Sequence, residues 1–143
     1  MCPGGLTLSK IRVLLGDDHG EMLEHVSKLL PADGCIVVGT ASDGQAAIDA
    51  AVKLRPDVVV LDISMPILNG IQAAKHMKDA NPFIKIVFLT VLTDTDVCRA
   101  ALETGALGYV LKSRLGTDLI PALKLATFGS RFVSPGCETP DKP

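Results

Sequence analysis

The sequence predicts an α/β protein in which a doubly wound, five-stranded parallel sheet is covered by helices on both faces. Three observations support this fold class. Short apolar runs rich in Val and Ile alternate with segments whose apolar residues recur at helical spacing. The intervening segments are long enough to hold the crossover helices that parallel strands require. The chain has 143 residues, 48% hydrophobic and 21% charged, which suits one domain with a substantial core.

Five runs are predicted to be strands because they are rich in β-branched residues and are bounded by polar or turn residues. They are Ile11–Leu15, Ile36–Thr40, Val58–Leu61, Ile84–Leu89 and Gly108–Leu111. Val58–Leu61 is apolar at every position, which is typical of a strand that is buried on both faces.

Five segments between and after these strands are predicted to be helices. They are residues 19–30, 44–54, 70–80, 95–104 and 117–128. The fourth ends before Gly105 and the last before Gly129, and glycine suits the position that follows a helix. Pro121 is expected in or near the first turn of the last helix, where a missing N–H costs least.

Right-handed crossovers and the flavodoxin-like strand order 2-1-3-4-5 complete the predicted topology. The globular domain is expected over residues 10–129. Residues 1–9 are expected to be an N-terminal tail. Residues 130–143 are rich in Pro, Gly and polar residues, and we expect a flexible C-terminal tail or a truncated linker there.

Composition argues against several classes of function. The formal net charge is −2 and Lys and Arg do not cluster, so this chain is not expected to bind nucleic acid directly. The four cysteines are scattered without CxxC spacing, which argues against a zinc site and a disulfide scaffold. No stretch is apolar enough to span or enter a membrane, so a cytoplasmic protein is expected.

Polar side chains follow four of the predicted strands. Asp17 and Asp18 come after the first strand, Asp62 after the third, Thr90 after the fourth and Lys112 after the fifth. In the predicted order these strand ends are contiguous, so three carboxylates, a hydroxyl and an ammonium converge on one edge. The carboxylates repel one another unless a cation joins them or one takes up a proton, and Mg²⁺ prefers such oxygen ligands.

Simpler interpretations exist for each of these residues. Asp62 would start a turn, Asp17 and Asp18 would cap a helix, Lys112 would be a solvated surface residue, and Thr90 an ordinary strand residue. Their joint position at strand ends favours a site instead. The three histidines, His19, His25 and His76, show no metal-ligand spacing and are expected at the surface or at helix edges.

Four motifs resemble those of the bacterial two-component response-regulator receiver domain, a CheY-like fold. They are GDDH at 16–19, LDISMP at 61–66, FLT at 88–90 and GYVLKS at 108–113. The resemblance covers roughly residues 10–128. It implies that Asp62 is the phosphoacceptor and that Mg²⁺ is held by Asp18 directly, by Asp17 through water, by Asp62, and by the backbone carbonyl of Ser64.

The resemblance also assigns roles to the remaining residues. Lys112 and Thr90 would contact the phosphoryl group. Tyr109 matches the aromatic residue that turns inward when the threonine moves, which changes the surface of the fourth helix, fifth strand and fifth helix. An ordinary half-buried aromatic residue is the alternative reading of Tyr109. Val91 departs from the family, in which a small residue usually follows the threonine, and a larger side chain would restrict access to the phosphoryl group.

The implied partner is a sensor histidine kinase that donates the phosphoryl group. The segment RFVSP at 131–135 is similar to the linker of the NarL/LuxR-type subfamily, which carries a C-terminal DNA-binding domain that this chain lacks. The chain is therefore either a stand-alone receiver or a fragment cut before its output domain. An apolar face along the fourth and fifth helices would serve a homodimer or a foreign partner equally well.

Three other functions compete with the phosphorylation switch. One is a degenerate receiver that works as a phosphorylation-independent protein-binding module, which the complete acidic set and Lys112 argue against. A second is a Mg²⁺-dependent phosphohydrolase, but Ile63 and Ser64 follow Asp62 where a second carboxylate would be expected as general acid. A flavin-binding protein lacks an evident phosphate-cradling loop here. The switch is not an enzyme acting on an external metabolite.

Overall fold

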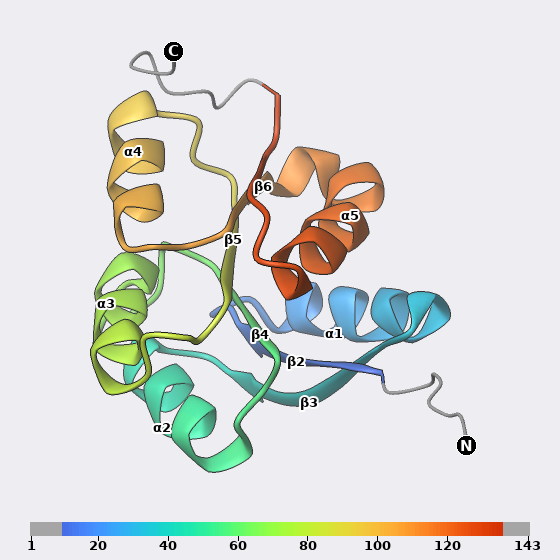
Figure 1. Cartoon of the computed structure of the whole chain (residues 1–143), viewed down its shortest axis with the longest axis horizontal. Coiled ribbons are helices and arrows are strands. Elements are labelled where there is room, and N and C mark those ends of the chain that lie inside the picture. Colours follow the sequence, from blue (N-terminus) through green and yellow to red (C-terminus); the bar gives the residue numbers. More distant parts are fainter. Residues whose placement is uncertain (1–9, 136–143) are drawn as a thin grey trace.

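The computed structural model describes residues 10–135 of the chain and contains one parallel sheet (Figure 1). Its strands are β2 (Ile11–Gly16), β3 (Cys35–Ala41), β4 (Val58–Leu61), β5 (Ile86–Thr90), β6 (Gly108–Leu111) and β7 (Phe132–Val133). They are hydrogen-bonded in the order β3-β2-β4-β5-β6-β7. All five neighbouring pairs run parallel, as the alternation of strands and helices predicts.

Helices cover both faces of this sheet. They are α1 (Gly20–Leu29), α2 (Gly44–Leu54), α3 (Gly70–Ala80), α4 (Thr95–Glu103) and α5 (Leu115–Thr127), with short 3-10 turns η1 (Leu30–Asp33) and η2 (Lys112–Arg114). Figure 1 shows α1 and α5 on one side of the sheet and α2, α3 and α4 on the other. Among residues 10–135, no helix is both long and apolar enough to cross a membrane.

The core consists of two apolar layers, one on each face of the sheet. Alternation along β2 shows why, since Val13 and Leu15 belong to one layer and Leu14 to the other. All four residues of β4 are buried, as expected for a central strand with helices on both sides. The sheet is therefore a rigid platform whose carboxyl edge can hold polar groups in fixed positions.

The prediction of five strands was wrong by one. β7 adds a sixth strand beside β6, where Phe132 N–H donates to the Leu107 carbonyl at 2.8 Å and Ser134 N–H to the Tyr109 carbonyl at 2.9 Å. A two-residue strand is too short to produce a periodic pattern, so only tertiary pairing defines it. The order of the other five strands agrees with the prediction.

The predicted position of Pro121 was also wrong. The last helix begins at Leu115 rather than at residue 117, directly after η2, so Pro121 lies inside α5. The proline has no N–H to donate to the carbonyl of Thr117, four residues earlier. Packing of the buried face of α5, which includes Leu119, Ala122 and Leu123, compensates for the lost hydrogen bond.

The segment that follows α5 is held to the domain by a buried polar network. Ser134 is fully buried, and its hydroxyl donates to Asp118 Oδ2 at 2.7 Å and accepts from Leu111 N–H at 3.1 Å. Arg114 Nε also donates to Asp118, at 2.8 Å. Burial alone would raise the pKa of Asp118, but hydrogen bonds from Arg114, Ser134 and Thr117 outweigh it and lower that pKa.

Ser134→Ala is expected to lower the free energy of unfolding by about 1–2 kcal/mol, because a buried carboxylate and a buried N–H each lose a partner. The pKa of Asp118 is lower in the folded protein than in the unfolded chain, where it is about 3.9. The ionised carboxylate therefore stabilises the fold fully above that unfolded pKa, and this stabilisation is lost as the pH falls through the folded pKa. The difference between the two proteins should therefore shrink in acid. Urea unfolding at pH 7 and pH 3 measures it.

Ser130→Ala serves as the control, because the Ser130 side chain is exposed and its backbone N–H, which the substitution keeps, donates to the Leu125 carbonyl at 2.9 Å. That variant should unfold like the wild type at both pH values. An equal loss in both variants would show that the Ser134 network does not hold the segment in place.

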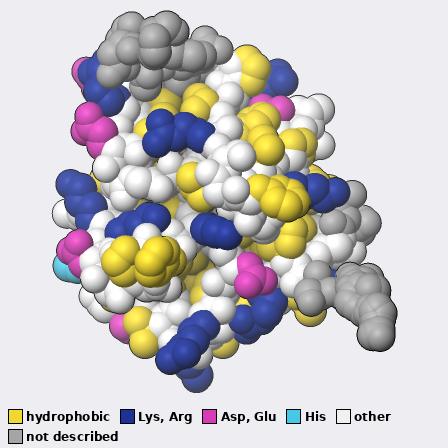
Figure 2. Space-filling model, in the orientation of Figure 1, with side chains coloured by type: hydrophobic (Ala, Val, Ile, Leu, Met, Phe, Trp, Pro, Cys, Tyr) yellow, Lys and Arg dark blue, Asp and Glu magenta, His cyan; other side chains and the backbone are white. Residues whose placement is uncertain are grey.

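The surface carries charge of both signs. On the face seen in Figure 2, Lys and Arg side chains lie scattered among hydrophobic and uncharged ones and do not form one continuous patch. Non-specific nucleic-acid binding depends on a basic footprint, which this face does not provide.

Candidate functional site

Four strand ends meet at the carboxyl edge of the sheet and carry the polar residues that the sequence singles out. Asp17 follows β2, Asp62 follows β4, Thr90 is the last residue of β5, and Lys112 follows β6. Asp17 and Asp62 are only 4% and 3% exposed and Thr90 is fully buried. The sheet thus places two carboxylates and a hydroxyl in a location where charge is costly without a partner.

Backbone pairing fixes the two buried carboxylates. Asp17 N–H donates to the Ala41 carbonyl at 2.9 Å, and Asp62 N–H donates to the Gly16 carbonyl at 2.8 Å. Both residues therefore continue the hydrogen-bond ladder one step beyond their strands. Their side chains inherit the rigidity of the sheet.

Lys112 lies between these carboxylates. Its Nζ is 2.7 Å from Asp17 Oδ2 and 3.1 Å from Asp62 Oδ2, and its side chain is only 10% exposed. One ammonium therefore neutralises two buried carboxylates only in part. The local excess of negative charge favours a further cation.

The ionisation of both partners reflects this imbalance. Burial raises the pKa of Asp62 above its usual range, the Lys112 charge opposes the rise, and the Asp17 charge adds to it. Burial alone would lower the pKa of Lys112, but hydrogen bonds and charge from Asp17 and Asp62 outweigh burial and raise it. Lys112 stays charged at neutral pH, whereas an additional positive charge would stabilise ionised Asp62.

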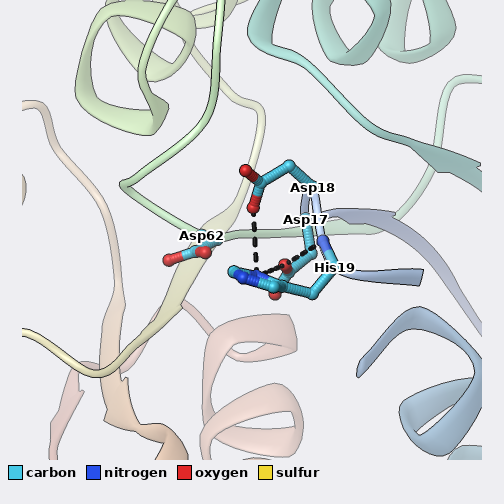
Figure 3. Close-up of side chains that lie close together, drawn as sticks. All are labelled: Asp17, Asp18, His19 and Asp62. Atoms are coloured by element: carbon cyan, nitrogen blue, oxygen red, sulfur yellow. Dashed lines mark hydrogen bonds and ion pairs between the residues drawn. The ribbon is translucent and has the colours of Figure 1, made fainter. Parts of the chain in front are cut away.

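Asp18 and His19 form the outer wall of the pocket. His19 Nδ1 lies 3.1 Å from Asp17 Oδ1 and 3.1 Å from Asp18 Oδ1, and Figure 3 shows the ring between the two carboxylates. His19 N–H also donates to Asp17 Oδ1 at 2.9 Å. The side chain of Asp18 is 35% exposed, so the pocket opens to solvent on this side.

The loop between β4 and α3 begins at Asp62 and folds back over the end of β4. Gly70 N–H donates to the Ile63 carbonyl at 2.8 Å, which folds the loop back over the strand end. A Cβ at Gly70 would lie 2.1 Å from the Asp62 carbonyl oxygen, so only glycine fits this close approach. Ser64 is exposed in this loop, two residues beyond Asp62.

Thr90 and Tyr109 are linked through the loop that follows β5. Leu92 N–H donates to Thr90 Oγ1 at 3.3 Å, and the Tyr109 hydroxyl donates to the Leu92 carbonyl at 2.8 Å. Tyr109 is fully buried and packs against Phe88, with ring centroids 6.4 Å apart. The inward position of Tyr109 is therefore held by both a hydrogen bond and an aromatic contact. Val91, between Thr90 and Leu92, is 67% exposed, and its expected effect on access stays a prediction.

The donor set of the pocket fits a hard divalent cation. Each of Asp17, Asp18, His19 and Asp62 offers one ligand atom, and these atoms all lie within 4.8 Å of one another. Carboxylate oxygens from two or three residues, completed by water, are the usual ligands of Mg²⁺. Burial raises the pKa of Asp62 and the neighbouring Asp17 charge adds to that rise, so a bound cation would favour the ionised carboxylate.

Sequence reasoning placed His19 at a helix edge, where the structure also has it, but did not connect it to the pocket. His19 is the N-cap residue of α1, without a side-chain capping hydrogen bond. Its contact with Asp17 and Asp18 depends on the sharp turn between β2 and α1. Direct adjacency to Asp18 in the sequence was the available signal.

Comparison with known families identifies the "Response regulator receiver domain" over residues 13–124. The response regulator GacA of Pseudomonas viridiflava is 35% identical over 126 residues, which cover 87% of this chain and 59% of GacA. The transcriptional regulatory protein DegU of Brevibacillus brevis is 33% identical over 128 residues, which cover 89% of this chain and 54% of DegU. The chain thus spans between half and two thirds of the length of these relatives.

Solved structures agree in fold. A LuxR-family two-component response regulator from Aurantimonas sp. SI85-9A1 has a TM-score of 0.85 at 32% identity, covering 89% of this chain and 91% of that one. The isolated REC domain of RcsB from Salmonella enterica serovar Typhimurium, in the presence of the phosphomimetic BeF3-, has a TM-score of 0.82 at 31% identity, covering 90% and 96%. Another structure holds two RcsB dimers bound to DNA.

Proposed function

Because this chain belongs to the response regulator receiver domain family, we propose that it is a signalling switch whose phosphoacceptor is Asp62. The observation that carries this assignment is the contact of Lys112 Nζ with both Asp17 and Asp62, at 2.7 and 3.1 Å. This contact places a nucleophilic carboxylate, a second carboxylate and a fixed positive charge side by side at the carboxyl edge of the sheet. Such a set is suited to accept a phosphoryl group.

We infer that Mg²⁺ is held by Asp18 and Asp62, by Asp17 through water, and by the backbone carbonyl of Ser64 as the remaining protein ligand. The mutual distances of the carboxylate oxygens and the excess negative charge support this assignment. When bound, Mg²⁺ supplies positive charge against the oxygens of the transferring phosphoryl group. Every residue of this site lies within residues 10–129, the expected extent of the domain, to which β7 adds a further strand.

Phosphoryl transfer follows from the position of Asp62. One oxygen of its carboxylate forms a bond to phosphorus while the bond from phosphorus to the donor breaks. For a kinase donor, the leaving group is the imidazole nitrogen of the phosphorylated histidine, which keeps the electron pair and takes up a proton. Lys112 stabilises the negative charge of the phosphoryl oxygens, and the Thr90 hydroxyl donates a hydrogen bond to one of them.

The partners follow from this chemistry and from the relatives. A sensor histidine kinase is the proposed donor of the phosphoryl group. RcsB dimers occur on DNA in a solved structure, and we propose that this chain likewise acts with a second copy and with a DNA-binding output domain. The relatives, which are named as a response regulator and a transcriptional regulatory protein, give no support to a phosphorylation-independent binding module.

The output step is proposed to pass from Thr90 to Tyr109. When Thr90 turns toward the phosphoryl group, its Oγ1 no longer accepts from Leu92 N–H, and the loop that binds the Tyr109 hydroxyl is free to shift. Tyr109 lies on β6, next to α4 and α5, so its surroundings would change with the loop. A local electrostatic event would thereby alter a surface that a partner can bind.

Tyrosine fluorescence tests this step, because Tyr109 is the only tyrosine and the chain has no tryptophan. Acetyl phosphate with Mg²⁺ should change the emission of the wild type. In Thr90→Val, which keeps the side-chain shape but loses the hydroxyl, the change should fall to less than about a fifth of the wild-type value, since the switch depends on that group. Unchanged emission in a wild type that mass spectrometry shows to be fully phosphorylated would refute the proposed step.

A further inference from the structure

We propose that His19 is an additional, nitrogen-donating ligand of the pocket, which gives it selectivity for ions such as Ni²⁺ over Mg²⁺. The proposal rests on the proposed function, because it requires that the pocket binds a divalent cation. His19 is not one of the residues to which the proposed function assigns a role, which are the three aspartates, Thr90 and Lys112. The ion class follows from ligand chemistry, since imidazole suits Co²⁺, Ni²⁺ and Zn²⁺ whereas carboxylate and water suit Mg²⁺.

The distances around His19 match those between neighbouring ligands of one ion. In an octahedral site with metal–ligand bonds of about 2.1 Å, adjacent ligand atoms lie about 3 Å apart. His19 Nδ1 is 3.1 Å from Asp17 Oδ1 and 3.1 Å from Asp18 Oδ1. His19 Nδ1 and Asp18 Oδ1 are therefore spaced as neighbouring ligands of a single ion, and Asp17 Oδ1 lies beside them (Figure 3).

Other contacts of the site leave the His19 ring available to an ion. Lys112 contacts Asp17 Oδ2 at 2.7 Å, and the His19 backbone N–H donates to Asp17 Oδ1 at 2.9 Å, so Asp17 has partners other than the ring. The His19 ring makes no capping hydrogen bond to α1, so it is not needed to satisfy the helix end. Its side chain is 67% exposed, so a hydrated ion can reach it from solvent. Ligation would replace the hydrogen bond from Nδ1–H with a bond from the nitrogen lone pair.

A competing account treats the ring only as a hydrogen-bond donor. In that case Nδ1–H bridges Asp17 and Asp18 and must be displaced before any cation binds. The two accounts predict opposite effects of removing the ring. If the His19 ring is a ligand, it strengthens the binding of nitrogen-preferring ions and changes the affinity for Mg²⁺ little. If the ring is a donor that must be displaced, it weakens the binding of every divalent cation.

Isothermal titration calorimetry with NiCl2 and with MgCl2, on untagged protein at pH 7.5, distinguishes them. His19→Ala should weaken Ni²⁺ binding at least about tenfold and change Mg²⁺ binding by less than about twofold. His25→Ala, which removes another histidine of α1, should leave both affinities unchanged. Circular dichroism verifies that each variant is folded. Stronger binding of both ions by His19→Ala, or unchanged Ni²⁺ binding, would overturn the proposal.

Pulsed electron paramagnetic resonance with Cu²⁺, a paramagnetic ion that prefers nitrogen ligands, gives a direct second measurement. The wild type should show nitrogen coupling from a bound imidazole, and His19→Ala should lose that coupling. Wild-type protein that binds Cu²⁺ and Mg²⁺ without nitrogen coupling would refute the role of His19 and leave the proposed function intact. Absence of any divalent-cation binding would instead contradict the proposed function itself.

Discussion

Asp62→Asn is expected to gain no phosphoryl group when it is incubated with acetyl phosphate and Mg²⁺. The wild type is expected to gain the mass of one phosphoryl group under the same conditions. An amide oxygen is too weak a nucleophile to attack phosphorus, so the loss should be complete rather than partial. The amide still accepts a hydrogen bond from Lys112, which lies 3.1 Å from the wild-type carboxylate, so the fold should survive. Intact-protein mass spectrometry over time measures the result.

Asp79→Asn is the matched control, because Asp79 is an exposed carboxylate on α3, outside the acidic pocket. It should be phosphorylated at the wild-type rate. A wild-type mass gain that persists in Asp62→Asn would move the phosphoacceptor to another residue. An equal loss in both variants would mean that the assay reports general damage rather than the site.

Gly70→Ala is expected to lower the free energy of unfolding by about 3 kcal/mol or more, since the new methyl group meets backbone rather than flexible side chains. Its Cβ would lie 2.1 Å from the Asp62 carbonyl oxygen and 2.9 Å from Ile63 Cα. Relief requires that α3 moves away from β4, which would open the loop behind Asp62. Urea unfolding with circular dichroism gives the free energy.

Gly116→Ala is the control for this substitution. A Cβ at Gly116, near the start of α5, has nothing within 4 Å, and alanine favours helix over glycine by up to about 1 kcal/mol. This variant should be as stable as the wild type or slightly more stable. A Gly70→Ala protein within about 0.5 kcal/mol of the wild type would show that the close packing of α3 on the strand end is not needed.

The sequence predicted the fold well where the pattern is local and repeated. β4 and β6 have the predicted bounds, as do α2 and α3, because four apolar residues in a row or a regular apolar face leaves little choice. β5 (Ile86–Thr90) begins two residues later and ends one residue later than predicted. Thr90 is therefore the last residue of the strand rather than the residue after it, and its hydroxyl still lies at the expected edge of the sheet.

The remaining differences depend on contacts between distant residues. β7 exists because Leu107 and Tyr109 offer backbone carbonyls at the open edge of β6, which no property of residues 132–133 alone reveals. Pro121 is tolerated inside α5 because the helix is packed along its length. The contact of His19 with Asp18 depends on the orientation of one side chain, which the adjacency of the two residues in the sequence permits but does not fix.

The most direct test of the phosphoacceptor assignment is chemical trapping of the modified residue. Borohydride reduces an acyl phosphate to an alcohol, so Asp62 in phosphorylated protein would become homoserine, and peptide mass spectrometry would locate it. The account predicts homoserine at position 62 alone, in samples that received both acetyl phosphate and Mg²⁺. Phosphorylated protein with an unreduced Asp62, or with homoserine at position 17 or 18, would contradict it.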